Sequence, residues 1–439
     1  MGCSASSATT AVNECQINVV RSFHESYCLG VKLGRGAFAQ VRDVTKIDPT
    51  TNEEVVGLNT KPKAVKIVDL RDKEDPTKIS HCMQKATQQE IAAWNAVGDV
   101  PSCVRLYEVF VESQVCFMVM EKCSSGLLQY LEQKPELNER SMGSVFMQML
   151  TGISHVHAAG VIHRDVKPDN FLVGGTDGQT IKLADFGLSI VTPKCGKAVG
   201  VFGTAPFMCP EMIKGMPYDA RSDVWSLAVI AYALLFGSFP YTPKEQSSKA
   251  MKKAIVDGVP PTFQPSANAV QTRSDTAIEF VRTLLDRDAE RRPTAVDALK
   301  TMYMVNAKDG NHMINSELPS LRPALFAARK AGAFEVRDPS RETPVDKVLS
   351  KLQVSQHGIP LPEVRPTKEL PQECGKKTRS TRSKKSSAES EVTSCPSNMW
   401  DNSSISCDSS AGSTRASSTG NLGKSHSGSP VPSPVAVRT

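Results

Sequence analysis

Apolar and polar residues alternate, or gather into short apolar runs, over most of the chain between residues 27 and 303. Four of these runs have the length and composition of β-strands, and they lie at residues 27–41, 63–68, 115–120 and 180–184. Elsewhere the apolar residues recur at helical spacing, and these stretches lie at residues 88–94, 138–159 and 221–228. The pattern therefore predicts both strands and helices within this part of the chain.

Two short helices are predicted beyond this part, at residues 323–330 and 344–352. They fall in a possible regulatory segment, residues 304–354. One interpretation is an autoinhibitory or docking segment that folds onto the preceding domain. The other is a loosely attached linker, because such short spans form stable helices only when they are packed. The sequence leaves both open.

The chain is polar and rich in serine from residue 355 to residue 439, and such a composition cannot bury a core. We predict a disordered tail there. Its basic run at residues 376–385 has six cations and no acidic residue. That run suits attraction to an anionic membrane, a nuclear-localisation signal or simple solvation, and the sequence does not choose among them.

Composition narrows the class of protein. The chain has 439 residues with 40% hydrophobic residues, which suits a soluble globular protein, and a net charge of +6, which is too mild to indicate nucleic-acid binding. Its 12 cysteines include no Cys-x-x-Cys pair, so we expect reduced, intracellular thiols. No apolar run approaches the roughly 18 residues that span a bilayer, and no signal peptide is recognisable.

The amino terminus fits the pattern for N-myristoylation, with Gly2 as the acceptor and Ser6 at the favoured hydroxyl position. Cys3 is placed for palmitoylation, and a second acyl chain is what makes membrane residence stable. The alternative is an ordinary terminus rich in small residues. We favour acylation and expect a cytoplasmic protein at the cytosolic face of a membrane.

Candidate catalytic residues are concentrated at residues 163–170, whose sequence is His-Arg-Asp-Val-Lys-Pro-Asp-Asn. Within six positions Asp165, Lys167 and Asn170 supply a proton acceptor, a fixed cation and an amide oxygen. Further on, Asp185 precedes Phe-Gly and adds a hard oxygen ligand suited to Mg²⁺. These groups are the minimum needed to transfer a phosphoryl group to a hydroxyl, where positioning and charge neutralisation do most of the catalysis.

Both strings resemble the catalytic loop and the metal-binding motif of eukaryotic protein kinases, and the resemblance covers residues 27–303. It implies an α+β, two-lobed fold with a small antiparallel β lobe that contains one key helix and a larger, mostly α lobe. ATP would bind in the cleft between them. The remaining chain then divides into an acylated flexible segment, residues 1–26, the possible regulatory segment and the disordered tail.

The resemblance also assigns an ATP site. Residues 33–41 form a glycine-rich hairpin in which Ala39 replaces the third glycine, and Lys66 matches the lysine that grips the α- and β-phosphates. A solvent-facing strand lysine is the alternative for Lys66. Glu90 is the expected ion-pair partner of Lys66. The full set of cofactor-binding residues is Gly34, Gly36, Val41, Ala64, Lys66, Glu90, Met120, Glu121 and Cys123.

Residues 115–123 resemble the last strand of the small lobe and the hinge, and the sequence departs from the family pattern directly after them. Residues 124–128 are about one residue short and lack the acidic residue that commonly holds the ribose hydroxyls. Ser124 or Ser125 could take its place. In many kinases that acidic residue also binds a basic residue of the substrate. Because it is missing here, a preference for basic substrates cannot be inferred from the resemblance.

In the catalytic loop, the resemblance makes Asp165 the base that orients the target hydroxyl and Lys167 the cation that neutralises the migrating phosphoryl group. Asn170 and Asp185 would bind Mg²⁺. Thr204 is similar to the threonine that hydrogen-bonds the catalytic Asp and Lys in serine/threonine kinases. We also expect Asp223 to cap the catalytic loop from below.

The activation segment should run from residue 185 to residue 211, and Arg292 should pair with Glu211 at its end. The position at which many kinases are phosphorylated is Gly200 here, so Arg164 would meet no phosphate at the usual site. Either the segment is ordered without phosphorylation, or Ser189 or Thr192 serves instead.

The sequence thus predicts a serine/threonine protein kinase that uses ATP and Mg²⁺ and acts on protein substrates, with no nucleic-acid partner. Residues 170–173 resemble those of calcium/calmodulin-dependent-kinase-like enzymes. A pseudokinase, which keeps the fold without turnover, is the competing hypothesis from another class of protein. The intact Lys66, Asp165, Asn170 and Asp185 argue against it. A small-molecule kinase is disfavoured by Thr204 and the full activation segment.

Overall fold

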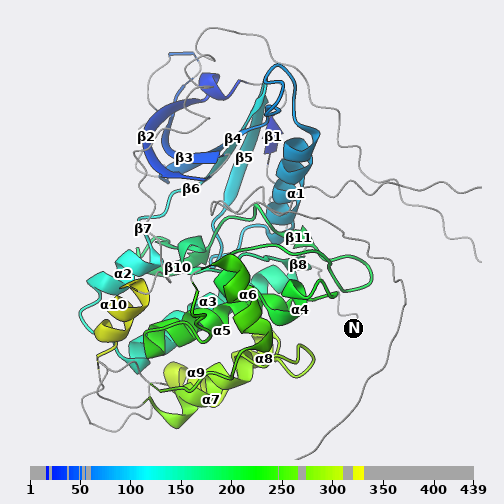
Figure 1. Ribbon diagram of the computed structural model, residues 1–439. Coiled ribbons are helices and arrows are strands. Elements are labelled where there is room, and N and C mark those ends of the chain that lie inside the picture. Colours follow the sequence, from blue (N-terminus) through cyan, green and yellow to red (C-terminus); the bar gives the residue numbers. More distant parts are fainter. Residues whose placement is uncertain are drawn as a thin grey trace, which may run out of the picture. The chain divides into compact units, whose positions relative to one another are not determined.

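The computed structural model describes residues 16–18, 22–36, 39–48, 50–51, 55, 61–245, 247–264, 273–309 and 320–330. All of them belong to one structural unit, Met1–Ser404. In Figure 1 a β-sheet with one long helix lies above a group of helices. This arrangement confirms the predicted α+β fold. Among the described residues no helix is both long and apolar enough to cross a membrane.

The sheet contains six strands in the order β1-β5-β6-β4-β3-β2, and neighbouring strands are antiparallel except for the parallel pair β1 and β5. Their bounds are Gln16–Asn18 (β1), Tyr27–Arg35 (β2), Ala39–Lys46 (β3), Lys63–Asp69 (β4), Leu106–Glu112 (β5) and Val115–Glu121 (β6). The central strand β6 is buried on both faces, which explains its nearly continuous apolar sequence. Its side chains alternate between two apolar clusters, one on each face of the sheet.

One of these clusters is rich in aromatic residues, and it includes Phe23, which lies in the predicted flexible segment. Phe23 lies in the short 3₁₀ helix η1 (Phe23–Glu25) and stacks on Phe117, with 4.3 Å between the ring centroids. Phe110 and Tyr27 also pack against the Phe23 ring. Residues 16–18 therefore form an edge strand of the sheet and residues 22–26 pack against it, although the sequence predicts a flexible segment over residues 1–26. Three extended residues and one aromatic anchor are too short a pattern to recognise.

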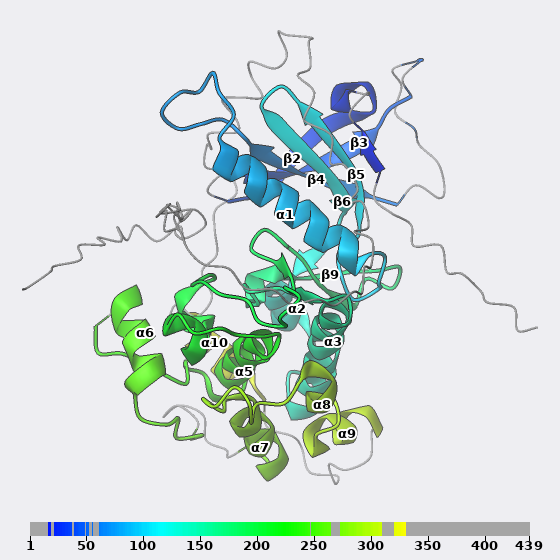
Figure 2. The ribbon, with the colours of Figure 1, turned by 90° about the vertical axis from the view of Figure 1, so that its right-hand side faces the viewer.

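The other face of the sheet is covered by α1 (His81–Val97), which runs along it in Figure 2. Met83, Ala93 and Trp94 of this helix are buried, and the indole Nε1 of Trp94 donates to the carbonyl of Val104 at 2.7 Å. The helix ends at Gly98, whose φ of +70° suits glycine. Glu90, on the same helix, is thereby turned toward the sheet.

The helical part is built around α3 and α5, which pack against each other. Every residue of α5 after Arg221 is buried, and apart from Ser222, Asp223 and Ser226 these residues are apolar or aromatic, as is typical of a helix at the centre of a core. The helices of this part are α2 (Leu127–Gln133), α3 (Glu139–Ala158), α4 (Pro210–Ile213), α5 (Arg221–Phe236), α6 (Ser248–Asp257), α7 (Asp275–Leu284), α8 (Ala295–Ala298), α9 (Met302–Asp309) and α10 (Arg322–Lys330).

Two small sheets hold the loops that matter for function. One has the order β10-β9-β7 and the other pairs β11 with β8. Their bounds are Ser125–Gly126 (β7), Val161–Ile162 (β8), Phe171–Gly174 (β9), Thr180–Leu183 (β10) and Ile190–Val191 (β11). The 3₁₀ helix η2 (Pro168–Asn170) lies between β8 and β9, and η3 (Ala205–Phe207) follows β11. The loop between β8 and β9 and the segment after β10 are thus brought to the same edge.

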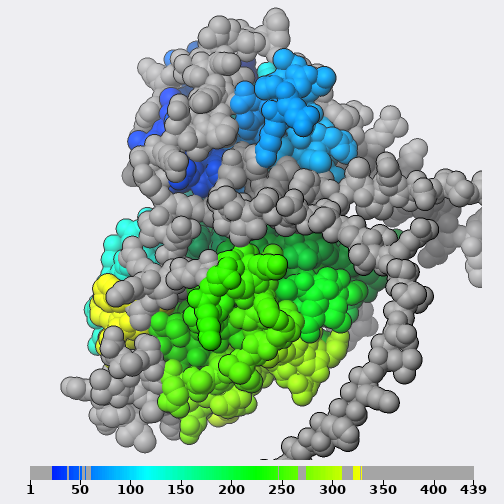
Figure 3. Space-filling model, viewed as in Figure 1, coloured from blue at the N-terminus to red at the C-terminus, as the bar shows by residue number. Residues whose placement is uncertain are grey.

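The helix predicted at residues 323–330 is present as α10, and it packs against α5 and the end of α2 (Figures 1 and 3). Leu325 and Ala328 are buried there. The Arg322 guanidinium donates to the carbonyls of Glu132, at 3.1 Å, and Lys134. Whether this segment regulates activity stays a prediction. The second predicted helix, residues 344–352, and the tail from residue 355 lie outside the described residues.

Candidate active site

The loop at residues 163–170 rests on the buried carboxylate of Asp223 in α5. That carboxylate accepts hydrogen bonds from the backbone amides of His163 and Arg164, both at 2.9 Å, and from Nε2 of His157 at 2.8 Å. Burial alone would raise the pKa of Asp223, but these hydrogen bonds hold it below its usual value. Asp223 thereby stabilises the left-handed backbone of Arg164, whose φ is +66°.

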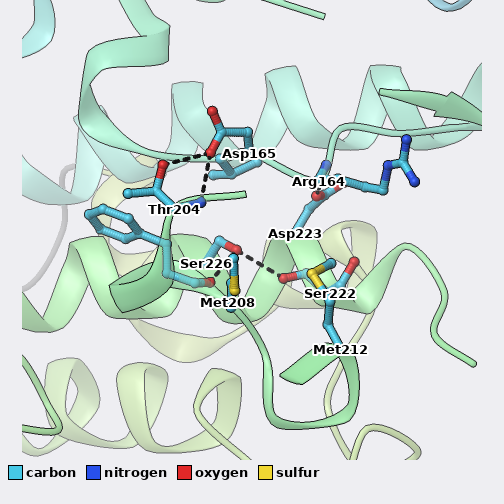
Figure 4. Close-up of a pocket in the computed structure, with 10 residues that line it drawn as sticks. Arg164, Asp165, Thr204, Met208, Met212, Ser222, Asp223 and Ser226 are labelled. Atoms are coloured by element: carbon cyan, nitrogen blue, oxygen red, sulfur yellow. Dashed lines mark hydrogen bonds between the residues drawn. The ribbon is translucent and has the colours of Figure 1, made fainter. Parts of the chain in front are cut away.

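Asp165 lies beside Thr204 (Figure 4), and it also hydrogen-bonds to Lys167. Its Oδ1 accepts from the Thr204 hydroxyl at 2.9 Å and from the Thr204 backbone amide at 3.1 Å, while its Oδ2 accepts from Lys167 Nζ at 2.7 Å. Lys167 Nζ also donates to the Thr204 hydroxyl at 3.2 Å. Burial would lower the pKa of Lys167, yet the Asp165 carboxylate outweighs it and raises that pKa. The lysine is therefore a permanent cation at neutral pH.

A second charged group joins the sheet to the start of the activation segment. Lys66 Nζ in β4 donates to Glu90 Oε1 at 2.6 Å and to Asp185 Oδ1 at 2.7 Å. Burial would lower the pKa of Lys66, but the two carboxylates raise it. Burial would likewise raise the pKa of Asp185, and the Lys66 ammonium holds it well below its usual range. Lys66 is therefore not a solvent-facing strand lysine, because only 8% of its side chain is exposed.

These groups face a cleft of about 620 Å³. Twelve of the fourteen predicted site residues line it: Gly34, Gly36, Val41, Ala64, Lys66, Met120, Glu121, Cys123, Asp165, Lys167, Asn170 and Asp185. Glu90 does not line the cleft, but its carboxylate accepts a hydrogen bond from Lys66, which does. Thr204 lines a separate cavity of about 10 Å³ beneath the catalytic loop, together with Ser222 and Ser226 (Figure 4).

The cleft has one apolar end and one polar end. Leu33, Val41 and Ala64 line it from the sheet, while Leu172 lines it from β9, and Lys66, Asn170 and Asp185 form the polar end. This division suits a ligand with a flat, apolar part and an anionic part. Sequence reasoning missed Leu33 and Leu172, because single leucines in short strands carry no signal of their own beyond burial.

The hinge is held by a nearly buried ion pair. Glu121 Oε2 at the end of β6 lies 2.9 Å from Lys182 Nζ in β10, so the pair joins the sheet to the helical part. Cys123 follows, and burial together with the Glu121 carboxylate raises the pKa of its thiol to about 12. The Ser124 hydroxyl donates to the Val173 carbonyl at 2.9 Å. Both Ser124 and Ser125, the proposed substitutes for the ribose acid, line the cleft.

The end of the activation segment is fixed by Glu211 and Arg292. Arg292 is fully buried and donates to both carboxylate oxygens of Glu211, at 2.7 and 3.1 Å. Such a planar, two-bond pair is geometrically specific. The side chains of Asp223, Arg292 and Lys66, far apart in sequence, thus anchor the three segments that form the site.

Comparison with known proteins gives the family. A family model described as protein kinase domain matches residues 27–304, more than half of the chain. The chain therefore belongs to the protein kinase family and carries the catalytic domain of an ATP-dependent protein kinase of the serine/threonine type.

Three relatives illustrate the match. A probable myosin light chain kinase of Dictyostelium discoideum is 31% identical over 271 residues, 61% of this chain and 78% of that protein. A hormonally up-regulated neu tumor-associated kinase homolog A of Xenopus laevis is 30% identical over 288 residues, 64% of this chain and 38% of that protein. A calcium and calcium/calmodulin-dependent serine/threonine-protein kinase of Medicago truncatula is 27% identical over 338 residues, 72% of this chain and 64% of that protein.

Protein kinases generally use ATP and Mg²⁺, and the donor set in this cleft fits a hard cation. The Asn170 amide nitrogen donates to the Asp165 carbonyl at 2.8 Å, which leaves the amide oxygen as the atom for a metal. The Asp185 side chain is 49% exposed to the cleft. Among the described residues no cluster of three or more His, Cys, Asp or Glu is placed for a metal.

The contacts of Thr204 give a first prediction. Replacing Thr204 with Val removes the hydroxyl that bridges Asp165 and Lys167. Hydrogen bonds to charged groups contribute about 1.5–3 kcal/mol, so we expect the single-turnover rate of phosphoryl transfer to fall on the order of 10–100-fold. Thr204→Ser keeps the hydroxyl and should retain most of the rate. A Val variant as fast as the parent would contradict a role for this hydroxyl.

Proposed function

We propose that this chain is a catalytically active kinase that transfers the γ-phosphoryl group of ATP to serine or threonine hydroxyls of protein substrates. The observation that carries the proposal is the fixed Asp165 carboxylate, which Thr204 and Lys167 hold in the cleft that also contains Lys66 and Asp185. A proton acceptor and a phosphate-binding cation in one cleft are what this reaction requires.

In the proposed reaction the substrate hydroxyl oxygen forms a bond to the γ-phosphorus while the bond from that phosphorus to the bridging oxygen of ADP breaks. Asp165 orients the hydroxyl and accepts its proton. Lys167, 2.7 Å from Asp165, neutralises the charge on the migrating group. Lys66 binds the α- and β-phosphates. Mg²⁺ held by Asn170 and Asp185 would supply further neutralisation of the phosphate charge.

A pseudokinase would be expected to lack one of these groups or to hold it away from the cleft. Support for turnover comes from Lys66, Asp165, Asn170 and Asp185, which all line the same cleft. The missing ribose acid and Ala39 are compatible with turnover, because neither position supplies a group to the transfer itself. We therefore favour catalysis over a scaffold role.

Replacing Asp165 with Asn tests the proposal. The test follows transfer of ³³P from ATP with Mg²⁺ to a peptide library, because the same library reports the substrate consensus. We expect a loss of at least roughly 10²-fold, since the amide cannot accept the hydroxyl proton. Asp257→Asn is the matched control, because Asp257 is an exposed residue of α6 that pairs with Lys253. Equal rates in the parent and the Asp165→Asn variant would refute the assignment of the base.

We further propose that the kinase is held at the cytosolic face of a membrane by acylation of Gly2 and Cys3. The support is the sequence pattern at residues 1–6, which lies outside the described residues. We also propose that, within the protein kinases, this chain is calcium/calmodulin-dependent-kinase-like. The Medicago relative supports this proposal.

Membrane anchoring is tested by fractionating cells that express the full chain. Gly2→Ala removes the acceptor of the myristoyl chain, so we expect the protein to move to the soluble fraction. Cys3→Ser should release it in part, because one acyl chain binds bilayers only marginally. Ser4→Ala is the control and should stay with the membrane. Unchanged membrane recovery of the Gly2→Ala variant would rule out the anchor.

A further inference from the structure

Arg164, the residue before Asp165, connects the catalytic loop to two parts of the activation segment that are distant in sequence. Its side chain points away from Asp165 (Figure 4). Nε donates to the carbonyl of Leu188 at 2.6 Å, and the guanidinium carbon lies 4.0 Å from the centroid of the Phe202 ring. Leu188 follows the metal-binding Asp185 by three residues, and Phe202 precedes Thr204 by two.

The contact with Phe202 is close and largely shielded from water. Arg164 is only 9% exposed, and its planar guanidinium lies over the face of the ring, where the π-electrons attract a cation. The surrounding chain holds the ring in this position. At Gly200, whose φ is +102°, an added Cβ would approach a Phe202 ring carbon to 2.4 Å. Gly200 therefore has to be a glycine for the ring to lie where it does.

We propose that Phe202 is a positioning residue for phosphoryl transfer, which acts through Arg164, and that this contact orders the activation segment without phosphorylation of that segment. The proposal rests on the kinase activity proposed above. The cation that could otherwise receive a phosphate is already engaged by an aromatic ring and a carbonyl. The same two contacts attach the parts of the segment next to Asp185 and next to Thr204 to the loop that carries Asp165.

The hydroxyl groups of the segment agree with this proposal. Residues 185–211 contain three of them, on Ser189, Thr192 and Thr204. Ser189 is buried, and its hydroxyl donates to the carbonyl of His163 at 3.2 Å. Thr204 is committed to Asp165. Of the two alternative phosphorylation sites considered from the sequence, only Thr192 remains accessible, and its backbone amide already donates to Gly160 at 2.7 Å.

Unmodified groups also hold the middle of the segment. Ala198 exchanges two backbone hydrogen bonds with Tyr218, at 2.7 and 2.9 Å. Lys197 Nζ lies 2.9 Å from Glu290 and 3.4 Å from Asp219. β11 pairs with β8 next to the catalytic loop. The segment is thus attached along its length, and Phe202 completes the attachment at the catalytic residues.

The first experiment measures kcat/KM of the full chain before and after phosphatase treatment, with mass spectrometry of the peptide that spans residues 185–211. We expect the dephosphorylated protein and the Thr192→Ala variant to retain the activity of the untreated parent. A large loss on dephosphorylation that rephosphorylation of this peptide restores would overturn the proposal. If the untreated parent is itself inactive, the proposed function fails instead, so the two failures are distinguishable.

The second experiment is a double-mutant cycle at Phe202 and Gly200. Phe202→Ala should lower kcat roughly 5–30-fold with little change in KM for ATP, because a desolvated cation–π contact is lost while the nucleotide cleft is intact. Phe202→Tyr keeps a π face and should retain kcat. Gly200→Ala should displace the ring and lower kcat similarly, and the double variant should be no worse than either single variant, since both remove one contact.

The matched control is Val199→Ala, since Val199 belongs to the same segment, is 65% exposed and is apolar. It should leave kcat unchanged. Thermal midpoints of all variants show whether they fold, and the phosphatase experiment needs no variant at Phe202. Additive losses in the cycle, or a Phe202→Ala variant with the parent's kcat, would refute the positioning role.

Discussion

The site depends on a single buried ammonium shared by two carboxylates. Lys66 lies on the central part of the sheet, Glu90 on the helix that covers it, and Asp185 at the start of the activation segment. Removing one partner of a buried ion pair typically costs about 3–5 kcal/mol, because a charge is left without compensation. This group therefore fixes three separately encoded elements in one arrangement, and each element presents its functional groups only when the others are in place.

In the helical part, too, buried charged side chains hold separate segments together. Asp223 organises the catalytic loop from below, and Arg292 fixes the end of the activation segment through Glu211. Between these anchors the backbone of Arg164 adopts a left-handed conformation that an arginine takes only under constraint. Asp165 consequently needs no rearrangement to face the cleft. Its carboxylate is already oriented by Thr204 and Lys167, and preorganised charge of this kind is usually the largest contribution to catalysis.

Much of this could be predicted because the functional residues occur in short, ordered strings. The strand at residues 63–68, the long helix at 138–159 and the charged groups around Asp165 all carry local patterns that read directly from the sequence. The contact between Arg164 and Phe202 could not, since residues 38 positions apart show no periodicity that links them. β1 could not be predicted either, because a strand of three residues is too short to show a pattern. Nor could the place of Leu172 in the cleft, because a single leucine in a short strand carries no signal beyond burial. The roles assigned to the site residues remain predictions.

The unmodified chain already holds its catalytic groups in one cleft. A crystal structure of the dephosphorylated full chain with Mg²⁺ and a non-hydrolysable ATP analogue tests this arrangement most directly. We expect Lys66 Nζ to stay within hydrogen-bonding distance of Glu90, with Asp165, Asn170 and Asp185 facing the same nucleotide. A structure in which α1 has moved away from the sheet, so that Lys66 and Glu90 no longer touch, would contradict this expectation.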